Sequence, residues 1–283
     1  MSANDEKNIF SYTPVQDGIE VTRVRCASSH LVIPETIDGR RVFGLGVSAC
    51  AELEMRSVTL PEGIRYLRAS AFAYCEHLKY IRLPDSVDEL GPSCFEGCTK
   101  LAEVRLPPKL RIISKSLFEE CFSLQEVQVP AHVEKLDERA FEFCLQLEHI
   151  SLPDGLRFIE NGCFFLDKRL KEFDMPDTVE RTGKEILLGC RSLERVHISR
   201  TLSKVECGLL ARCRKLRSIS LPLSVHVVCD GAFAECRTMT SFSYAYPDIV
   251  MGKKVFDGCD ALLGDPAFVQ RMKPFIENQQ GRK

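Results

Sequence analysis

The sequence predicts a right-handed solenoid of 23-residue coils, with a parallel β-sheet on its concave face and short turns, 3₁₀ turns or single helical turns opposite. Three observations predict this fold class. Proline, cysteine and phenylalanine each recur every 23 residues. The three series stay in phase over about two hundred residues, and a fourth series of leucines accompanies them. Agreement between independent series indicates coils that bury their apolar side on their neighbours.

The four series contain few exceptions. The prolines are Pro61, Pro84, Pro107, Pro130, Pro153, Pro176 and Pro222, with Ser199 in the one gap. The cysteines are Cys75, Cys98, Cys121, Cys144, Cys190, Cys213, Cys236 and Cys259, with Asp167 out of pattern. The phenylalanines are Phe72, Phe95, Phe118, Phe141, Phe164, Phe233 and Phe256, with Leu187 and Leu210 between them. The fourth series is Leu78, Leu101, Leu124, Leu147, Leu170, Leu193, Leu216, Met239 and Leu262.

One unit shows how a coil is built. In residues 78–84, Ile81 and Leu83 alternate with Tyr80 and Arg82, which is typical of a strand, and Pro84 ends it. Val87 and Leu90 then indicate a second extended or turn segment, and the residues around Phe95 and Cys98 a returning turn. Strand spacing of about 4.8 Å gives a sheet roughly 40 Å long. Coils of this length with one strand have the dimensions of leucine-rich repeats, so we predict a leucine-rich-repeat solenoid.

The unit L-x-x-I-x-L-P-x-x-V-x-x-L-G-x-x-x-F-x-x-C at 78–98 resembles the BspA-like subclass of leucine-rich repeats. The resemblance covers roughly residues 9–262, including a cap-like stretch that begins at Phe10 and contains Asp17–Val21. It implies the repeat fold and a surface or secreted protein that binds other proteins. Departures at Asp167, Thr182 and Ser199 predict that the coils between about 164 and 205 stack least regularly.

Three parts are expected along the chain: an N-terminal cap at 1–48 with residues 1–8 loose, repeats at 49–262, and a C-terminal helical cap and tail at 263–283. Asp265 and Pro266 suit the start of a helix, and Pro274 is expected to kink or split it. The apolar face of this helix carries Phe268, Met272, Phe275 and Ile276. It covers the last coil or, alternatively, binds a partner.

Composition excludes several classes of protein. With 38 Lys and Arg against 40 Asp and Glu, the net charge of −2 argues against nucleic-acid binding. No apolar run is long enough to insert into a membrane. The start MSANDEKNIFSYT does not read as a signal peptide, which favours a cytoplasmic protein. The alternative is a secreted or cell-surface protein whose leader was removed. A monomer is favoured.

The fourteen cysteines favour a structural core rather than chemistry. Nine of them, counting Cys50, are assigned to the repeat position, where each sulfur has only two neighbouring sulfurs. Zinc needs four converging ligands, so we expect no metal site, no cofactor and no catalytic residue. No H-E-x-x-H, G-x-S-x-G or phosphate-loop motif is present. So many thiols suggest a reducing compartment. The alternatives are some disulfides, or a thiol redox or metal protein.

The outward strand positions carry the candidate binding site, because they vary from coil to coil while the core series stay constant. Arg, Tyr and His are residue types that anchor interfaces. The candidate ligand-binding residues are Tyr80, Arg82, Glu103, Arg105, Glu126, Gln128, His149, Glu172, Asp174, Arg195 and His197. They predict a non-catalytic protein-binding scaffold; a surface adhesin or glycan-binding protein of the BspA-like type is the alternative. An ordinary solvated sheet face, with Arg82/Arg105 and Glu103/Glu126 neutralising each other, is the plainer interpretation.

A second series after the proline alternates in sign at every coil: Arg65, Asp88, Arg111, Glu134, Arg157 and Glu180. Opposed unlike charges support neighbouring strands, so we interpret this series as structural. Beside it lie Tyr66, Ile112 and Phe158, which form a possible second binding surface if they face solvent. Alternatively, the aliphatic stems of charged side chains cover them.

Overall fold

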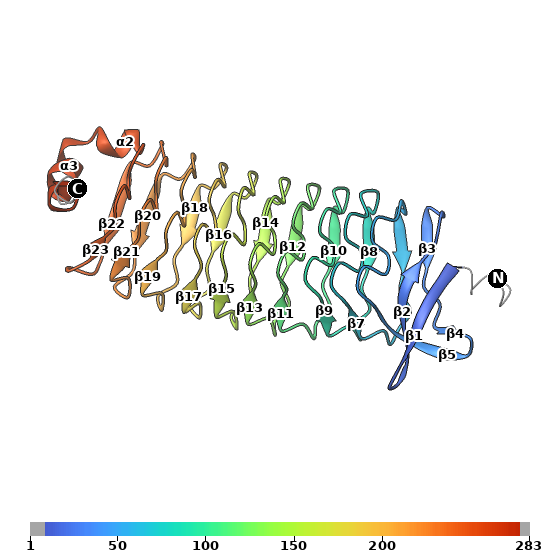
Figure 1. The fold of residues 1–283 in the computed structure, drawn as a ribbon. Coiled ribbons are helices and arrows are strands. Elements are labelled where there is room, and N and C mark those ends of the chain that lie inside the picture. The colour runs from blue at the N-terminus through green and yellow to red at the C-terminus, as the bar shows by residue number, and fades with distance from the viewer. Residues whose placement is uncertain (1–8, 278–283) are drawn as a thin grey trace.

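The computed structural model describes residues 9–277, and Figure 1 shows them as an elongated stack of coils. A first strand column runs along one side of the stack, with one strand of three or four residues per coil. Its members are β3 (His30–Val32), β6 (Ser57–Thr59), β8 (Tyr80–Arg82), β10 (Glu103–Arg105), β12 (Glu126–Gln128), β14 (His149–Ser151), β16 (Glu172–Asp174), β18 (Arg195–His197), β20 (Ser218–Leu221) and β22 (Ser241–Tyr244). The strands are parallel, and their residues pair at the repeat spacing, as Tyr80 does with Glu103. The predicted parallel-strand repeat fold is confirmed.

A second strand column of two-residue strands follows each proline position, where an extended or turn segment was expected. Its members are β7 (Tyr66–Leu67), β9 (Glu89–Leu90), β11 (Ile112–Ile113), β13 (Lys135–Leu136), β15 (Phe158–Ile159), β17 (Arg181–Thr182), β19 (Lys204–Val205), β21 (Val227–Val228) and β23 (Val250–Met251). In each strand from β9 to β21, the second residue is buried. The coil is thus held to its neighbours by two sets of backbone hydrogen bonds.

The ladders are interrupted at a few coils. In the first strand column the hydrogen-bonded sheet breaks on both sides of β16 and β18, within or beside the region from 164 to 205 where irregular stacking was expected. Thr182 is buried there, and its hydroxyl has no partner among the described residues. Ser199, which replaces the proline, is fully buried and donates to the Val179 carbonyl at 2.8 Å. The second strand column breaks between β17 and β19, in the region where irregular stacking was expected, and also between β9 and β11, which the sequence did not indicate.

Stacked phenylalanines form the centre of the core. The rings of Phe72, Phe95, Phe118, Phe141 and Phe164 are fully buried. Their centroids lie 5.4 to 5.7 Å apart with interplanar angles of 2° to 19°. Leu187 and Leu210 interrupt the stack, and it resumes with Phe233 and Phe256 at 5.9 Å. Identical side chains at identical positions therefore fill the interior without a change of backbone.

The return of each coil is a turn segment rather than a helix. Backbone bonds within a coil, such as Cys98 N to Phe95 O at 3.2 Å, alternate with bonds to the next coil, such as Phe95 N to Leu117 O at 3.0 Å. Non-glycine residues with positive φ, including Ser93 at 56°, turn the chain there. Alternating bonds inside and between coils satisfy the backbone of this segment as a strand ladder would.

The position assigned to Cys50 is wrong. Its backbone N bonds to Ala71 O, as that of Phe72 bonds to Cys94 O, so Cys50 stands in the phenylalanine series. Cys50 lies 22 residues before Phe72, one fewer than the period, so extrapolating the period misplaces Cys50. The repeat thiol position contains eight cysteines, which are Cys75, Cys98, Cys121, Cys144, Cys190, Cys213, Cys236 and Cys259.

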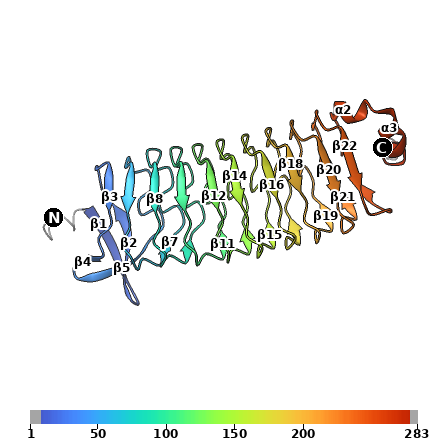
Figure 2. The same cartoon turned by 180° about the vertical axis from the view of Figure 1, so that it is seen from behind.

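The two ends of the stack differ (Figure 2). At the N-terminal end, β1 (Phe10–Val15) and β2 (Gly18–Val24) form an antiparallel hairpin. It extends the second strand column through β5 (Arg40–Leu45), which also pairs antiparallel with β4 (Thr36–Ile37). At the other end lie α2 (Asp260–Leu263) and α3 (Pro266–Glu277). The terminal stretches 1–8 and 278–283, expected to be loose, lie outside the described residues.

Helix α3 begins as the sequence indicates, because Asp265 Oδ1 accepts a bond from Ala267 N at 2.9 Å. It continues through Pro274 as one helix, so the expected split is not found. Phe268 and Met272 are buried and Phe275 packs against the core, whereas the side chain of Ile276 lies outside those described. No helix within residues 9–277 is long and apolar enough to cross a bilayer.

Candidate binding face

Strand alternation places the candidate side chains on one surface. In β8, Tyr80 and Arg82 are exposed while Ile81 between them is buried, and β12 repeats this pattern. We call the outward positions of β8 to β18 the first-strand face. Ten of the eleven candidates are exposed and His197 is half-buried. The candidates are Tyr80, Arg82, Glu103, Arg105, Glu126, Gln128, His149, Glu172, Asp174, Arg195 and His197.

The strand register places like charges side by side on this face. Arg105 pairs in register with Arg82, and Glu103 pairs in register with Glu126. Like charges directly opposed across strands are destabilising. The face therefore carries a basic pair and an acidic pair next to each other. The register does not support the mutual neutralisation considered from the sequence, because the directly opposed partners share a sign.

Some candidates have ion partners and others have none. Arg105 Nη2 lies 3.3 Å from Asp85 Oδ1, and His197 Nε2 lies 3.0 Å from Asp177 Oδ1. Arg195 pairs with Glu172 on the adjacent strand. Hydrogen bonds from Arg200 N and from His197 lower the pKa of Asp177. Within residues 9–277, four charged candidates make no ion pair: Arg82, Glu103, Glu126 and Asp174.

A groove of about 600 Å³ lies over β10 and β12. Its lining includes Glu103, Arg105, Glu126 and Gln128, so the structure brings four of the candidates together. The segments after these two strands also contribute to the lining, with Pro108, Pro130, Ala131 and His132. His132 was not singled out from the sequence because it lies beyond the strand. Its distance of two residues from the repeat proline is the only signal that could have identified it.

Charged side chains beside the second strand column are arranged differently, because unlike charges lie next to each other. Arg111 Nη1 lies 3.0 Å from Glu134 Oε1, and Arg157 Nη2 lies 2.8 Å from Glu180 Oε1. Arg65 pairs with Asp88 in the same way. The alternating series thus resolves into separate neutral pairs. Side chains of this column compensate one another within the chain, as expected of a structural surface.

The possible second surface is mostly covered. The guanidinium of Arg68 lies 4.1 Å from the ring centre of Tyr66. Those of Arg157 and Arg181 each lie 5.3 Å from the ring centre of Phe158. Only Ile112 is largely exposed, at 47%. Since Tyr66, Ile112 and Phe158 stand two coils apart, they do not form a continuous apolar stripe.

The repeat cysteines are buried hydrogen-bond donors. Each repeat thiol donates to a backbone carbonyl of the preceding coil at 3.0 to 3.3 Å; Cys121, for example, donates to Phe95 O. Burial raises the pKa of Cys144 and Cys190 well above the ordinary value and that of Cys259 to about 12. A thiol must be ionised to attack or to bind a metal. Cys75 is an exception, because the neighbouring Cys98 lowers its pKa. The members with a raised pKa favour cohesion over chemistry, and all fourteen cysteines are free thiols.

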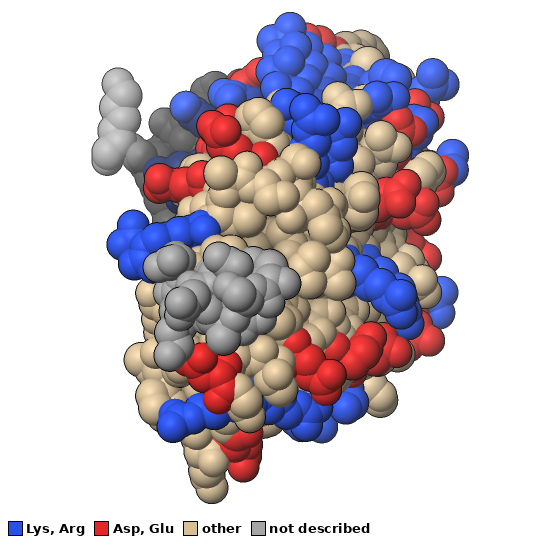
Figure 3. Space-filling model, turned by 90° about the vertical axis from the view of Figure 1, so that its right-hand side faces the viewer, with Lys and Arg blue, Asp and Glu red and all other residues tan. Residues whose placement is uncertain are grey.

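Charge at the N-terminal end is mixed. In the end-on view of Figure 3, both basic and acidic side chains reach the rim around a centre of other residues. Neither basic nor acidic side chains alone cover the face shown in that view.

Comparison with known proteins agrees with this architecture. Six copies of a BspA type leucine rich repeat region match residues 26–148 and 136–263. A leucine-rich repeat protein from Eubacterium ventriosum superposes with a TM-score of 0.52 at 16% identity, over 81% of this chain and 76% of that one. One from Bacteroides ovatus gives 0.46 at 17% identity, over 96% and 97%. No curated protein gives a significant match.

The Eubacterium ventriosum protein is too distant in sequence to indicate more than the fold. The family match, in contrast, covers most of the chain, and its two ranges span the coils where the ladders are interrupted. The coils with irregular residues are therefore part of the same repeat. The chain belongs to the BspA-type leucine-rich repeat family.

Proposed function

We propose that the protein is a non-catalytic scaffold that binds another protein through the first-strand face. The like-charge pairs Arg82/Arg105 and Glu103/Glu126 carry this proposal. The same chain alternates unlike charges on its second strand column, where they neutralise each other. A face that leaves like charges opposed loses a little stability. A partner with complementary charges would remove that loss.

The charge pattern defines the chemistry of the partner. An acidic segment fits over Arg82 and Arg105, and a basic segment fits over Glu103 and Glu126. Tyr80, which is 61% exposed, lies in register with Glu103 and supplies a large side chain of the type that anchors interfaces. The groove over β10 and β12 gives the partner a recess at the acidic pair.

Neutralising the face tests the proposal. A variant with Arg82→Gln, Glu103→Gln, Arg105→Gln and Glu126→Gln should lose the proteins that wild type captures from a lysate at low salt. Its melting temperature should change little, because the two repulsive pairs and the exposed Arg105–Asp85 ion pair are lost together. The control neutralises the same number of charges on the other column: Arg111→Gln, Glu134→Gln, Arg157→Gln and Glu180→Gln. If both variants capture the same proteins as wild type, the first-strand face is not the binding surface.

We further propose that the protein works where its thiols stay reduced, as in the cytoplasm. The eight repeat cysteines support this, because each donates an S–H bond that only a reduced thiol can make. Thiol titration before and after denaturation tests it. The repeat thiols of the natively isolated protein should react only after unfolding. Disulfides recovered at these positions would contradict the proposal.

A further inference from the structure

Two cysteines outside the repeat series lie next to each other at the turn after the second strand column. Lys204 pairs in register with Val227, and Val205 pairs with Val228. Continuing this register places Glu206 beside Cys229, and Cys207 is the next residue. Cys207 and Cys229 are 22 residues apart, one fewer than the period. The pattern of residues repeated every 23 positions therefore does not pair them.

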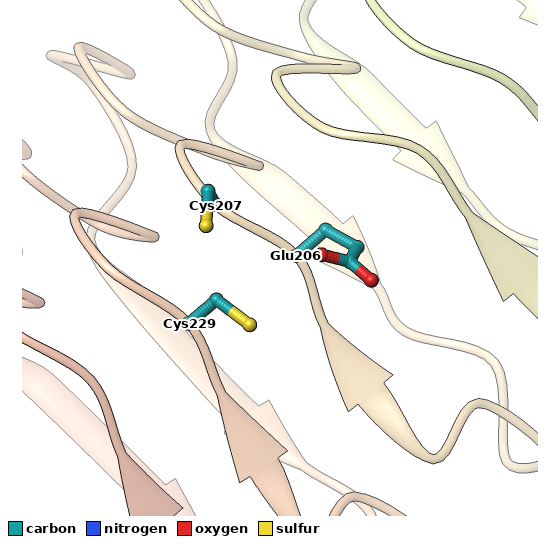
Figure 4. A group of neighbouring side chains, drawn as sticks. All are labelled: Glu206, Cys207 and Cys229. Atoms are coloured by element: carbon teal, nitrogen blue, oxygen red, sulfur yellow. The ribbon is translucent and has the colours of Figure 1, made fainter.

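The three side chains converge. One ligand atom from each of Glu206, Cys207 and Cys229 lies within 4.8 Å of the other two, and all three residues are half-buried (Figure 4). Among the described residues, no other group of three or more potential metal ligands has its ligand atoms this close together.

We propose that Glu206, Cys207 and Cys229 form a binding site for one thiophilic divalent cation of the Zn²⁺ class. Zinc binds thiolate sulfur at about 2.3 Å and carboxylate oxygen at about 2.0 to 2.2 Å. Ligand atoms already within 4.8 Å of one another need only small side-chain rotations to reach such a centre. Three protein ligands leave the fourth tetrahedral position to water, as in other zinc sites that remain open.

The neighbouring coils do not repeat this arrangement. The positions that correspond to Glu206 and Cys229 in the coils before and after are Gly183 and Gly252, which have no side chain. The positions that correspond to Cys207 are Lys184 before and Asp230 after. Asp230 Oδ1 accepts a bond from Lys253 N at 2.7 Å, and Asn161 makes the equivalent bond to Lys184 N at 2.8 Å. Cys207 occupies the same position in its coil, but its thiol lies by Cys229.

Lys204 contacts one of the three proposed ligands. Its Nζ lies 2.8 Å from Glu206 Oε1. Binding of one M²⁺ displaces the two thiol protons to solvent and exchanges the Lys204 contact of Glu206 for the metal.

Titration with Co²⁺ and Zn²⁺ tests the site on the reduced full-length protein under anaerobic conditions. One Co²⁺ per chain should produce a sulfur-to-cobalt charge-transfer band together with the visible bands of tetrahedral cobalt, and Zn²⁺ should displace it. Cys207→Ser and Cys229→Ser should each abolish the charge-transfer band. Glu206→Gln should weaken Co²⁺ binding at least about 10-fold, the smallest loss usual even for residues that only support a ligand.

Cys26→Ser is the matched control, since Cys26 is also half-buried but lies in the N-terminal part of the chain. It should bind Co²⁺ as wild type does. A second measurement distinguishes loss of the site from misfolding of a variant. Zn²⁺ should raise the melting temperature of wild type and of Cys26→Ser but not of Cys229→Ser. The proposal is overturned if cobalt binds without sulfur bands, or if Cys26→Ser loses as much as Cys207→Ser. It is equally overturned if the pair binds no metal and only forms a disulfide when a disulfide oxidant such as oxidised glutathione is added.

Discussion

Asp167 shows what one residue does when it enters a series of thiols. It is fully buried, and neither of its carboxylate oxygens has a hydrogen-bond partner among residues 9–277. The thiols before and after it, Cys144 and Cys190, each donate to a carbonyl of the preceding coil. Burial raises the pKa of Asp167 well above its ordinary value of 3.8. Burial therefore favours the uncharged form of this carboxyl group in the folded protein.

Asp167→Cys should stabilise the protein, increasingly so as the pH rises. The folded protein holds the Asp167 proton more tightly than the unfolded chain does. Wild-type stability from this group is therefore complete below about pH 3.8 and falls as the pH rises toward the raised folded-state pKa. The stability difference between variant and wild type should widen by about 1.4 kcal/mol per pH unit over that window. Urea unfolding at a series of pH values measures it.

Asp167→Asn is the control, because it removes the titration and keeps a buried polar group. It should lose the pH dependence but gain less stability than the cysteine variant. Glu142, whose pKa burial raises to about 7, titrates in the same window in all three proteins, so only the differences between them report on Asp167. Identical pH profiles for wild type and Asp167→Cys would show that the buried carboxyl does not control stability.

At the scale of strands, the two columns share one period but arrange charge in opposite ways. Charges beside the second column form pairs such as Arg111 with Glu134, whereas the first-strand face opposes Glu103 to Glu126. The 23-residue register decides both arrangements, because it places equal positions of successive coils side by side. The amino acid at each position then determines the sign of the charge there.

Neutralising one glutamate in each column should therefore have opposite effects. Glu134→Gln breaks the 3.0 Å pair with Arg111 and should lower the free energy of unfolding by up to about 1 kcal/mol. Glu126→Gln relieves the repulsion with Glu103 and should leave stability unchanged or raise it by a few tenths of a kcal/mol, roughly. Melting curves at low salt compare the two variants, and both effects should shrink in high salt. Equal losses in both variants would contradict the charge argument for the first-strand face.

The sequence predicted what is periodic. The two strand positions, the phenylalanine core and the thiol series follow from equal spacing, because identical coils bury identical positions. Features one residue out of phase were not predicted: Cys50 falls in the phenylalanine series, and Cys207 meets Cys229. A one-residue difference in coil length changes the neighbours of a side chain completely.

The sequence predicted which side chains form the candidate face, but it did not predict which of them have ion partners. Alternation within the strands indicated which side chains point outward. It could not show that Arg105 reaches Asp85 or that His197 reaches Asp177, since these partners lie beyond the strand and depend on side-chain rotamers. The uncompensated charges emerge only when those pairs are known.

The whole molecule is a one-dimensional stack, so its stability depends on how its ends are closed. Each coil contacts only its neighbours, and a terminal coil has one apolar side without a neighbouring coil. We propose that α3 closes the C-terminal end. Phe268 is 3% exposed and lies 5.4 Å from the ring of Phe256. Arg271 Nη2 also donates to Phe242 O at 2.9 Å, which ties the helix to β22.

Phe268→Ala should loosen the C-terminal coils and leave the distant ones unchanged. Removing a buried phenylalanine costs about 3 to 5 kcal/mol. In a stack of nearest-neighbour contacts, that loss lowers the local opening free energy of the adjacent coils first. Hydrogen exchange should therefore accelerate at the amides of β20 and β22 and stay at the wild-type rate in β8 and β10.

Val269→Ala provides the comparison, because Val269 is the next residue of α3 and is 38% exposed. It should leave exchange near the wild-type rate along the whole chain. If Phe268→Ala instead accelerates exchange equally in β8 and β22, the coils unfold as one cooperative unit. The end helix would then stabilise the entire stack rather than its last coils.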